Sequence, residues 1–500
     1  MKKAILIFNL FLVSVTWGQS FDGYVLYNKQ NQNTTYLIDK DGNAAKTWSC
    51  NTSANYAVLL KEDGNIVRGG VYGSNQLNGA AIGGVVQEYD TNGDVVWEFI
   101  YSNSDHVSHH DIALNPTNNS VFLIAWEVIS QADLIQAGYD GATSEKWAPH
   151  FVEVEPDGSG GGQIIWEWHI MDHMIQDFDA SKDNYGVIAD HPELIDINQI
   201  AASGGGPGPP GGANGDWFHC NGIDYNPTLD QIVFTSRHSS EFYIIDHSTT
   251  TAQAATHTGG NTTKGGDILF RWGNPSNYDA PGAQIVPAAV HDPRWIKDGR
   301  PNAGYIQFFN NEGNNGSSTV DMINPPLIGY NYDWTSGTSY APTTYASRHN
   351  CLDNASGQSA SDRMSNGNIF VAVSHEYMYE VDANDNVVWQ YNADPAKAFR
   401  YECAYDGIQN LLGNICGLGV DENKTTELSV YPNPSNGEIT LDGITLNDYT
   451  VNVIDMQGNI VYSVNNKTKL DLSILANGLY FLKVFNENGV FAINQISLNK

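Results

Sequence analysis

The chain has 500 residues, of which 41% are hydrophobic and 11% aromatic, so it can bury a large core and is long for a single ordinary domain. Its 24 Lys and Arg residues against 56 Asp and Glu give a formal net charge of -32. Such a surface repels nucleic acid and anionic membranes, and both are excluded as expected partners. The 49 glycines and 12 tryptophans favour an all-β fold with many turns over a helical one.

The first 18 residues have the features of a signal peptide. Lys2 and Lys3 are basic, and an apolar run from Ala4 to Trp17 follows, which is too short to span a bilayer comfortably. We therefore expect residues 1–18 to be removed from an exported protein. Elsewhere the sequence has no apolar stretch long enough to cross a membrane, and we expect no transmembrane helix.

One sequence pattern recurs between residues 36 and 391. A short alternating strand ends in an acidic residue, a turn follows, and the next strand ends in tryptophan. Alternation with period two is typical of strands, and Asn-Gly or Asp-Gly turns are typical of tight hairpins. Five repeats are clear and a sixth, around residues 305–322, is blurred, so we predict a β-propeller, six-bladed, over residues 19–420. The acidic and tryptophan residues are Asp39 and Trp48, Asp90 and Trp97, Glu155 and Trp166, Asp246 and Trp272, and Asp382 and Trp389.

The composition changes near residue 417. Residues 421–427 read as a polar linker, and residues 428–500 read as a small all-β sandwich. The stretch from Tyr431 to Gly437, Tyr-Pro-Asn-Pro-Ser-Asn-Gly, resembles the C-terminal sorting domain of type IX secretion substrates. The resemblance implies export across an outer membrane, the type IX secretion machinery as a partner, and a secreted or cell-surface protein. The alternative is a generic small β-sandwich that binds a partner.

Histidines stand near strand ends or loops in several repeats, where binding and catalytic residues concentrate. A lone histidine at a strand end is usually structural. Different blades of a propeller converge at its axis, however, so histidines that are distant in sequence can form one site. The groups are His109 to Asp111, Asp216 to Asn221, Ser236 to His238, and Val290 to Trp295.

Ten segments spread through the expected propeller share a family likeness. They are 109–112, 122–127, 165–168, 172–177, 191–196, 216–219, 223–227, 236–238, 269–275 and 363–368. These segments resemble the bacterial arylsulfotransferases. The resemblance implies an exported enzyme that moves a sulfuryl group from an aryl sulfate ester to a phenolic acceptor, with no nucleotide sulfate donor and no cofactor. The sequence has no Gly-rich phosphate loop of the Walker type, which is consistent with this.

The resemblance also implies roles for individual residues. The family's nucleophilic histidine, which is transiently sulfated in a ping-pong reaction, matches His291, although Val290 stands where the family has Gln. The other expected catalytic residues are His219, Arg237 and His110, with His109 as an alternative to His110. We expect further substrate contacts from His109, His238, Arg294 and Trp217, and no metal.

These residue types suit sulfuryl transfer. Neutral imidazole is a good nucleophile and forms covalent adducts. The planar guanidinium of Arg237 can bind sulfuryl oxygens, and His219 and His110 can donate to those oxygens or protonate the leaving oxygen. Trp217, Phe218 and Trp295 could stack on an aromatic ring, or they could be core residues.

Other residues have structural interpretations. We expect Asp111, Asp216 and Asp292 to orient neighbouring histidines or to cap turns, and the recurring Asp39, Asp90, Asp246 and Asp382 to be turn residues. Of the five cysteines, Cys403 and Cys416 are the closest plausible disulfide pair. Two other functions stay open: a non-catalytic secreted propeller that binds a glycan or protein, and a metal-dependent hydrolase with histidine ligands.

Overall fold

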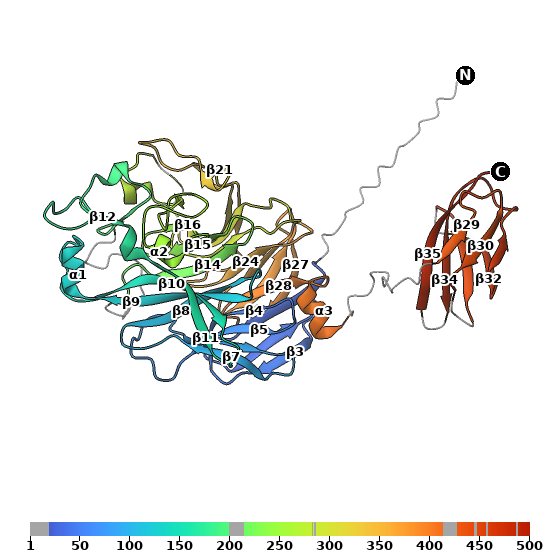
Figure 1. The fold of residues 1–500 in the computed structure, drawn as a ribbon, viewed down its shortest axis with the longest axis horizontal. Helices are drawn as coiled ribbons and strands as arrows, with labels where there is room; N and C mark the ends of the chain where they lie inside the picture. Colours follow the sequence, from blue (N-terminus) through green and yellow to red (C-terminus); the bar gives the residue numbers. More distant parts are fainter. Residues whose placement is uncertain are drawn as a thin grey trace, which may run out of the picture. The chain divides into compact units, whose positions relative to one another are not determined.

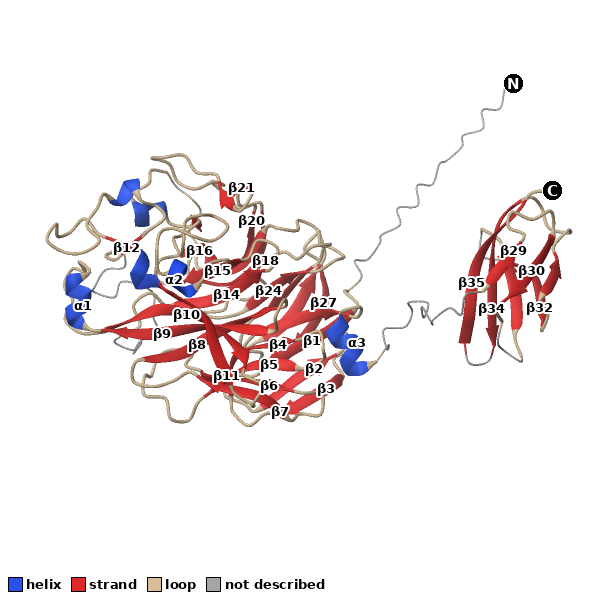
Figure 2. Cartoon of the chain, viewed as in Figure 1, coloured by secondary structure: helices blue, strands red, loops and turns tan. Residues whose placement is uncertain are grey.

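The computed structural model describes residues 20–199, 215–282, 284, 287–413, 428–444, 448–456, 459–486 and 489–500. The expected signal peptide and the linker 421–427 lie outside these residues. Contacts divide the chain into two compact units, Met1–Gly413 and Asn414–Lys500. Strands dominate both units and helices are few (Figure 2), which confirms the predicted all-β class.

Six four-stranded antiparallel sheets follow one another through the described residues of the first unit (Figure 1). The first sheet is β28 (Ala398–Glu402), β1 (Gly23–Asn28), β2 (Thr34–Ile38) and β3 (Ala44–Ser49). The second is β4 (Ala54–Leu60), β5 (Ile66–Val71), β6 (Gly84–Tyr89) and β7 (Val95–Ile100). The third is β8 (His106–Asn115), β9 (Ser120–Ile129), β10 (Lys146–Pro156) and β11 (Gly162–His169).

The remaining sheets of the first unit continue in the same order. The fourth sheet is β14 (Cys220–Asn226), β15 (Gln231–Ser236), β16 (Glu241–Asp246) and β17 (Phe270–Trp272). The fifth is β18 (Val290–Trp295), β19 (Ile306–Asn314), β20 (Ser317–Ile323) and β23 (Ser347–Asn350). The sixth is β24 (Ala360–Arg363), β25 (Ile369–Ala372), β26 (Tyr377–Val381) and β27 (Val387–Asn392).

Short elements connect these sheets. Two small pairs are β12 (Met174–Ile175) with β13 (Ile195–Asp196), and β21 (Leu327–Ile328) with β22 (Asn331–Tyr332). The α-helices are α1 (Gln131–Gln136), α2 (Thr251–Ala254) and α3 (Asp406–Leu412), and short 3-10 helices span Ile170–His173, Ile188–Asp190 and Pro275–Tyr278. None of the helices in the described parts of the chain is long and apolar enough to cross a membrane.

The predicted hairpins are the last two strands of the sheets, and the recurring Asp residues anchor the turns, whereas Asp157 rather than Glu155 anchors the turn of the third sheet. Asp39 Oδ1 accepts the backbone N–H groups of Asp41 and Asn43 at 2.9 and 2.8 Å, which is how Asp commonly stabilises a tight turn. Except for Trp97, whose Nε1 bonds Glu88 of its own sheet, the tryptophans connect neighbouring sheets. Trp48 Nε1 of the first sheet donates to the backbone oxygen of Asp90, in the second, at 2.9 Å.

One end strand of each sheet contacts the corresponding strand of the next. We call these the inner strands: β28, β4, β8, β14, β18 and β24. Their contacts run from β4 through β8, β14, β18 and β24 to β28, which in turn contacts β4. The first sheet combines both ends of the unit, because β1 pairs antiparallel with β28, with Val25 opposite Arg400.

The second unit consists of two antiparallel sheets around one hydrophobic core. The core includes Val451, Leu472 and Leu482, all fully buried. The three-stranded sheet is β29 (Ser429–Tyr431), β30 (Glu438–Asp442) and β33 (Lys469–Asp471). The four-stranded sheet is β32 (Ile460–Asn465), β31 (Thr450–Ile454), β34 (Gly478–Asn486) and β35 (Gly489–Leu498).

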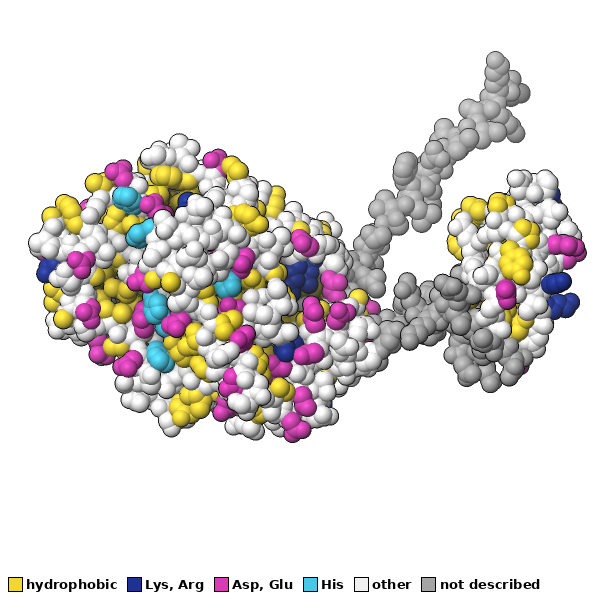
Figure 3. All heavy atoms as spheres, in the orientation of Figure 1, with side chains coloured by type: hydrophobic (Ala, Val, Ile, Leu, Met, Phe, Trp, Pro, Cys, Tyr) yellow, Lys and Arg dark blue, Asp and Glu magenta, His cyan; other side chains and the backbone are white. Residues whose placement is uncertain are grey.

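The surface and the cysteines agree with an exported protein. Acidic side chains are spread over the visible face of the first unit, with few Lys or Arg among them (Figure 3). Cys403 is disulfide-bonded, whereas Cys50, Cys220 and Cys351 are free thiols. Cys416 lies outside the described residues.

Candidate active site

On or next to three inner strands, a predicted site histidine lies at or beside a position where the hydrogen-bonding register with the neighbouring strand shifts. Such β-bulges re-aim side chains and are common beside active sites. A non-glycine residue at positive φ costs roughly 1–3 kcal/mol, and such residues cluster at functional sites. Here the ladder register shifts between Ser108 and Ile112, between Cys220 and Gly222, and between His291 and Arg294. At or beside these register shifts, His110 (53°), His219 (54°) and Asp292 (51°) have positive φ.

The bulges bring predicted site histidines from different sheets together. The rings of His110 and His219 meet edge to face with centroids 4.8 Å apart, and His219 stacks on His238 at 5.0 Å. His109 Nδ1 lies 2.6 Å from His110 Nδ1. We call these four residues, together with His291, the histidine cluster.

The hydrogen bonds of His291 fix its tautomer. Its Nδ1 lies 2.8 Å from the backbone oxygen of Ala289 and 2.7 Å from Asn311 Oδ1. The Asn311 amide is oriented by its Nδ2, which donates to the backbone oxygen of Ala355 at 2.8 Å. Both neighbours of Nδ1 are acceptors, so Nδ1 carries the proton and Nε2 of the neutral ring keeps its lone pair.

Charge and burial keep His291 neutral. Burial, followed by the neighbouring Arg237 guanidinium, lowers the pKa of His291 to about 3. Burial similarly lowers the pKa of His109 to about 3, and that of His110 well below its usual value. At neutral pH these three rings are therefore uncharged. His109 is held in place by stacking on Trp126, with ring centroids 3.8 Å apart.

His219 has a carboxylate partner. Its Nδ1 lies 2.5 Å from Asp216 Oδ2, and Asp216 Oδ1 accepts a hydrogen bond from Trp126 Nε1 at 3.1 Å. Burial raises the pKa of Asp216, but attraction to His219 and their hydrogen bond outweigh it, so the net pKa is lowered. The expectation that Asp216 orients a histidine is confirmed, and His219 presents Nε2 on its other side.

Arg237 is fixed beside this cluster. Its backbone N–H donates to the backbone oxygen of His219 at 3.0 Å, and its Nη1 donates to the backbone oxygen of Ser356 at 3.1 Å. Burial lowers the pKa of its guanidinium. Val290, which stands in place of the family's Gln, is fully buried in a hydrophobic core cluster.

Asp111 and Asp292 do not orient histidines, which corrects the expectation for both. They hold the ammonium group of Lys397, which is 2.7 Å from Asp111 Oδ2 and 3.0 Å from Asp292 Oδ1. All three side chains are 1% exposed. A buried cation balances two buried carboxylates better than neutral imidazoles can, because an unpaired buried charge is costly.

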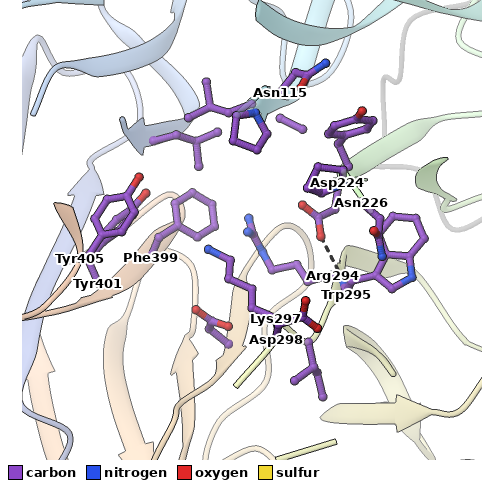
Figure 4. Close-up of a pocket in the computed structure, with 18 of the residues that line it drawn as sticks. Asn115, Asp224, Asn226, Arg294, Trp295, Lys297, Asp298, Phe399, Tyr401 and Tyr405 are labelled. Carbon is purple, nitrogen blue, oxygen red and sulfur yellow. Dashed lines mark hydrogen bonds between the residues drawn. The ribbon is translucent and has the colours of Figure 1, made fainter. Parts of the chain in front are cut away.

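A cavity of about 680 Å³ opens on the other side of Asp111 and Asp292 along the inner strands. On β8 and β18 the histidine comes first, then the Asp that holds Lys397, and then residues that line the cavity, including Ile112 and Arg294. The cavity is therefore separate from the histidine cluster. Figure 4 shows Arg294 and Lys297 extending into it beside Phe399.

The side chains of two predicted substrate contacts do not join the histidine cluster, although the backbone oxygen of Trp217 lies 2.8 Å from His238 Nδ1. Arg294 lines the cavity, where its Nε donates to Asp292 Oδ1 at 3.0 Å and its guanidinium lies 4.1 Å from the Phe399 ring centroid. Trp217 is 3% exposed and packs in a hydrophobic core cluster. Its ring meets Tyr139 edge to face at 5.5 Å.

Sequence reasoning missed two polar residues of this region. Asn311 lies within β19, and the adjacent buried residues Asn310 and Asn311 in that strand were the available signal. Lys397 has no motif around it. Metal binding was expected nowhere, yet two groups of side chains in the described residues could hold a metal ion, one of Glu127, His150 and His169 and one of His173, His257 and Asp267.

Comparison with protein families decides the identity of the first unit. The arylsulfotransferase (ASST) family model matches residues 8–340, more than half of the chain. The chain belongs to the arylsulfotransferase family. Residues 429–497 match the secretion system C-terminal sorting domain, which indicates export by type IX secretion to the cell surface or the medium. No curated protein matches the sequence.

Several solved structures resemble this chain at low sequence identity. A Bacteroides caccae protein of unknown function is 10% identical, covers 76% of this chain and 98% of its own, and has a TM-score of 0.40. BamB from Moraxella catarrhalis is 11% identical over 78% of this chain and 82% of its own, with a TM-score of 0.29. A nidogen/laminin complex is 8% identical over 75% of this chain and 97% of its own, with a TM-score of 0.35.

Proposed function

We propose that this arylsulfotransferase moves a sulfuryl group from an aryl sulfate ester to a phenolic acceptor through a sulfohistidine at His291, by a ping-pong mechanism. The observation that carries the proposal is the fixed tautomer of His291. Ala289 and Asn311 occupy Nδ1, so that Nε2 of a neutral ring is the nucleophile.

The proposed scaffold is a six-bladed β-propeller formed by residues 19–420, after removal of a signal peptide from residues 1–18. The closed order of contacts among the six inner strands supports this arrangement. So does the pairing of β1 with β28, because a blade shared by the first and last segments joins the two ends of the ring of sheets. Residues 428–500 serve sorting and take no part in catalysis.

In the first half-reaction, His291 Nε2 attacks the sulfur of the donor. The N–S bond forms as the S–O bond to the aryl group breaks, and the leaving phenolate takes the bonding electron pair. Arg237 is placed to neutralise charge on the sulfuryl oxygens. His219, backed by Asp216, supplies a proton to the leaving oxygen, and the neutral His110 ring donates a hydrogen bond to the sulfuryl oxygens.

In the second half-reaction, the acceptor phenol oxygen attacks the sulfur of the sulfohistidine. The S–N bond breaks, and the electron pair returns to His291 Nε2. The phenolic proton passes to the group that protonated the leaving oxygen. We propose that His109 and His238 contact the substrate within the histidine cluster. The side chains of Arg294 and Trp217 could contact the substrate only if part of it lay outside that cluster.

The test uses the purified full chain and p-nitrophenyl sulfate, with and without added phenol and with a chelator present. We expect nitrophenolate release that depends on phenol and is lost in His291→Ala. Intact-mass measurement without acceptor should detect one added sulfuryl group on the wild type alone. The matched control is His191→Gln, which alters a half-exposed histidine bonded to Glu193.

Each result is interpretable. Release without acceptor would mean that water accepts the group and that the protein acts as a sulfatase. Equal activity of His291→Ala and wild type would exclude His291 as the nucleophile. Absence of release with a panel of aryl sulfates would favour a binding role for the first unit.

A further inference from the structure

The cavity at the C-terminal ends of the inner strands has the features of a small-molecule site. Its volume is about 680 Å³, and small-molecule sites in proteins usually measure about 300–1,000 Å³. Each of the six inner strands contributes residues to its wall. Pro116, Thr228 and Asp298 line it from the turns that follow β8, β14 and β18 and are exposed, so the cavity opens to water.

Lys297 brings an ammonium group into this cavity, as Figure 4 shows. Within the described parts of the chain, this group makes no hydrogen bond or ion pair. Although the side chain is exposed, desolvation by the surrounding protein lowers the pKa of the ammonium group, and Arg300 and Arg294 lower it further. Attraction to Asp362 and Asp224 offsets only part of this decrease. An anion beside Lys297 would stabilise its charge.

Arg294 supplies a second cationic group to the same space. Its Nε donates to Asp292 Oδ1 at 3.0 Å, but its two terminal nitrogens have no hydrogen-bond acceptor among the residues that the structure describes. Its guanidinium lies over the Phe399 ring, 4.1 Å from the centroid, which holds the group in one plane. The free outer edge of a planar guanidinium matches the two oxygens of a carboxylate.

The acidic residues around the cavity are engaged elsewhere or face water. Asp362 accepts a hydrogen bond from Arg300 Nη1 at 2.7 Å, and Glu402 lies 3.8 Å from Arg300 Nε. Asp224 Oδ2 accepts the backbone N–H of the last residue of β18 at 3.0 Å, and burial raises the pKa of this carboxyl group to about 6. The other acidic residues of the wall are exposed, where water and salt screen their charge: Glu62 and Asp298.

Aromatic side chains form much of the remaining wall. Two of them are fixed by hydrogen bonds to β4: the backbone N–H of Leu60 donates to the Tyr401 hydroxyl at 2.9 Å, and the Tyr405 hydroxyl donates to the backbone oxygen of Leu60 at 2.9 Å. Fixed rings favour an aromatic ligand, because ring pairs gain more than the area that they bury. The aromatic residues are Tyr225, Trp295, Phe399, Tyr401 and Tyr405.

We propose that this cavity binds an aromatic carboxylate, with the carboxylate group between Lys297 and Arg294 and the ring against Phe399 and its aromatic neighbours. The formal net charge of the chain is -32, so its overall field repels anions and binding depends on these local cations. The site lies across Asp111 and Asp292 from the histidine cluster. It is therefore independent of the sulfuryl-transfer proposal.

The test is isothermal titration of the full chain with 2-naphthoate, which carries one carboxylate on two fused rings. We expect saturable binding to the wild type and at least about 10-fold weaker binding of the neutral 2-naphthalenemethanol. Lys297→Gln should weaken 2-naphthoate binding about 10-fold or more, as loss of a hydrogen bond to a charged group does. Because Lys297 has no partner among the described residues, this variant should unfold at the same urea concentration as the wild type.

The matched control is Lys182→Gln, which removes the same charge from a loop residue that does not line the cavity. It should leave the affinity unchanged. Asp224→Asn should strengthen binding, since it removes a negative charge beside the ligand, whereas simple damage to the cavity would weaken it.

Three results would overturn the proposal. The first is the absence of saturable 2-naphthoate binding to the wild type at millimolar concentrations. The second is equal affinity of Lys297→Gln and the wild type. The third is equally tight binding of 2-naphthalenemethanol, which would show that the two cations do not recognise a carboxylate.

Discussion

The indole Nε1 of Trp389 donates a hydrogen bond to the backbone oxygen of Lys40, 2.6 Å away, although 349 residues separate them. Trp48 makes the equivalent bond to Asp90 in the next sheet, and Trp166 bonds Thr249 Oγ1 at 3.2 Å. These three outer-strand tryptophans thus connect one sheet to its neighbour, and Trp389 connects the sixth sheet back to the first.

Loss of this bond should weaken the closure of the first unit. We expect Trp389→Phe to lower the free energy of unfolding by about 0.5–1.5 kcal/mol, the usual net worth of one hydrogen bond. Urea unfolding followed by tryptophan fluorescence would measure it, with Trp334→Phe as the control because Trp334 bonds within its own loop. An equal loss in both variants would count against a closing role.

Lys397→Met should lower the free energy of unfolding far more than Trp389→Phe does. It leaves Asp111 buried without its cation, whereas Asp292 keeps Arg294 at 3.0 Å. Removing one partner of a buried ion pair costs about 3–5 kcal/mol. Chemical unfolding measures this loss. Adding Asp111→Asn should recover much of it; a double variant as unstable as Lys397→Met would show that lost packing, not charge, is responsible.

The acid limb of the activity profile should not report His291. Its folded pKa of about 3 lies below the ordinary value of 6.5, so the ring stays mostly neutral down to about pH 4. Sulfuryl uptake from p-nitrophenyl sulfate, measured as single-turnover nitrophenolate release, should therefore show no loss due to His291 between pH 7 and 5. A limb near 6.5 that persists in both His219→Gln and His110→Gln would contradict this assignment.

Asp216→Asn should lower kcat while the protein stays folded. His219 would lose the carboxylate that fixes its Nδ1, and removal of a general acid or base costs about 10²–10⁴-fold. We expect a smaller loss for Asp216→Asn than for His219→Gln, and no further loss when the two are combined. Additive losses in the double variant would mean that Asp216 acts independently of His219.

We expect His247 to make the free energy of unfolding decrease as the pH becomes alkaline. It lies between Glu153 (2.9 Å) and Asp230 (2.6 Å). Burial lowers its pKa, but these carboxylates outweigh burial and raise it to about 9. The stabilisation is therefore complete below about pH 6.5 and is lost as pH rises through about 9.

Comparison with His247→Gln tests this linkage. The shift allows a difference of up to about 3 kcal/mol in the free energy of unfolding at pH 6. That difference should shrink steadily to pH 10. A difference that does not change with pH would mean that packing of the ring, which contacts Phe122 edge to face, is its main contribution.

The sequence predicted the strands better than the site. Alternation and Asp-anchored turns are local, so the hairpins that contain Asp39 and Asp90 followed directly from the pattern. The convergence of His110 and His219 also followed, because resemblance supplied their identity. The roles of Asp111 and Asp292 did not: their partner Lys397 is 286 and 105 residues away, and only the assembled inner strands bring the three together.

The cavity beside Arg294 was equally unpredictable. It arises where several inner strands end together, and no local pattern marks that level along the strands. Trp217 lies two residues before His219, and its backbone oxygen lies 2.8 Å from His238 Nδ1, yet its side chain packs among hydrophobic core residues. Both residues precede β14 in an irregular segment, so proximity in the sequence did not predict where the side chain points.

The pairing of β1 with β28 affects whether an exported chain can complete its first sheet. All six residues of β1 are buried, yet one of its two edges is covered only by residues 398–402. A chain truncated before that point exposes an unpaired, apolar edge, which favours aggregation or proteolysis. The sorting domain begins shortly afterwards. A chain that contains its sorting domain therefore also contains β28, whereas a chain truncated before β28 lacks both.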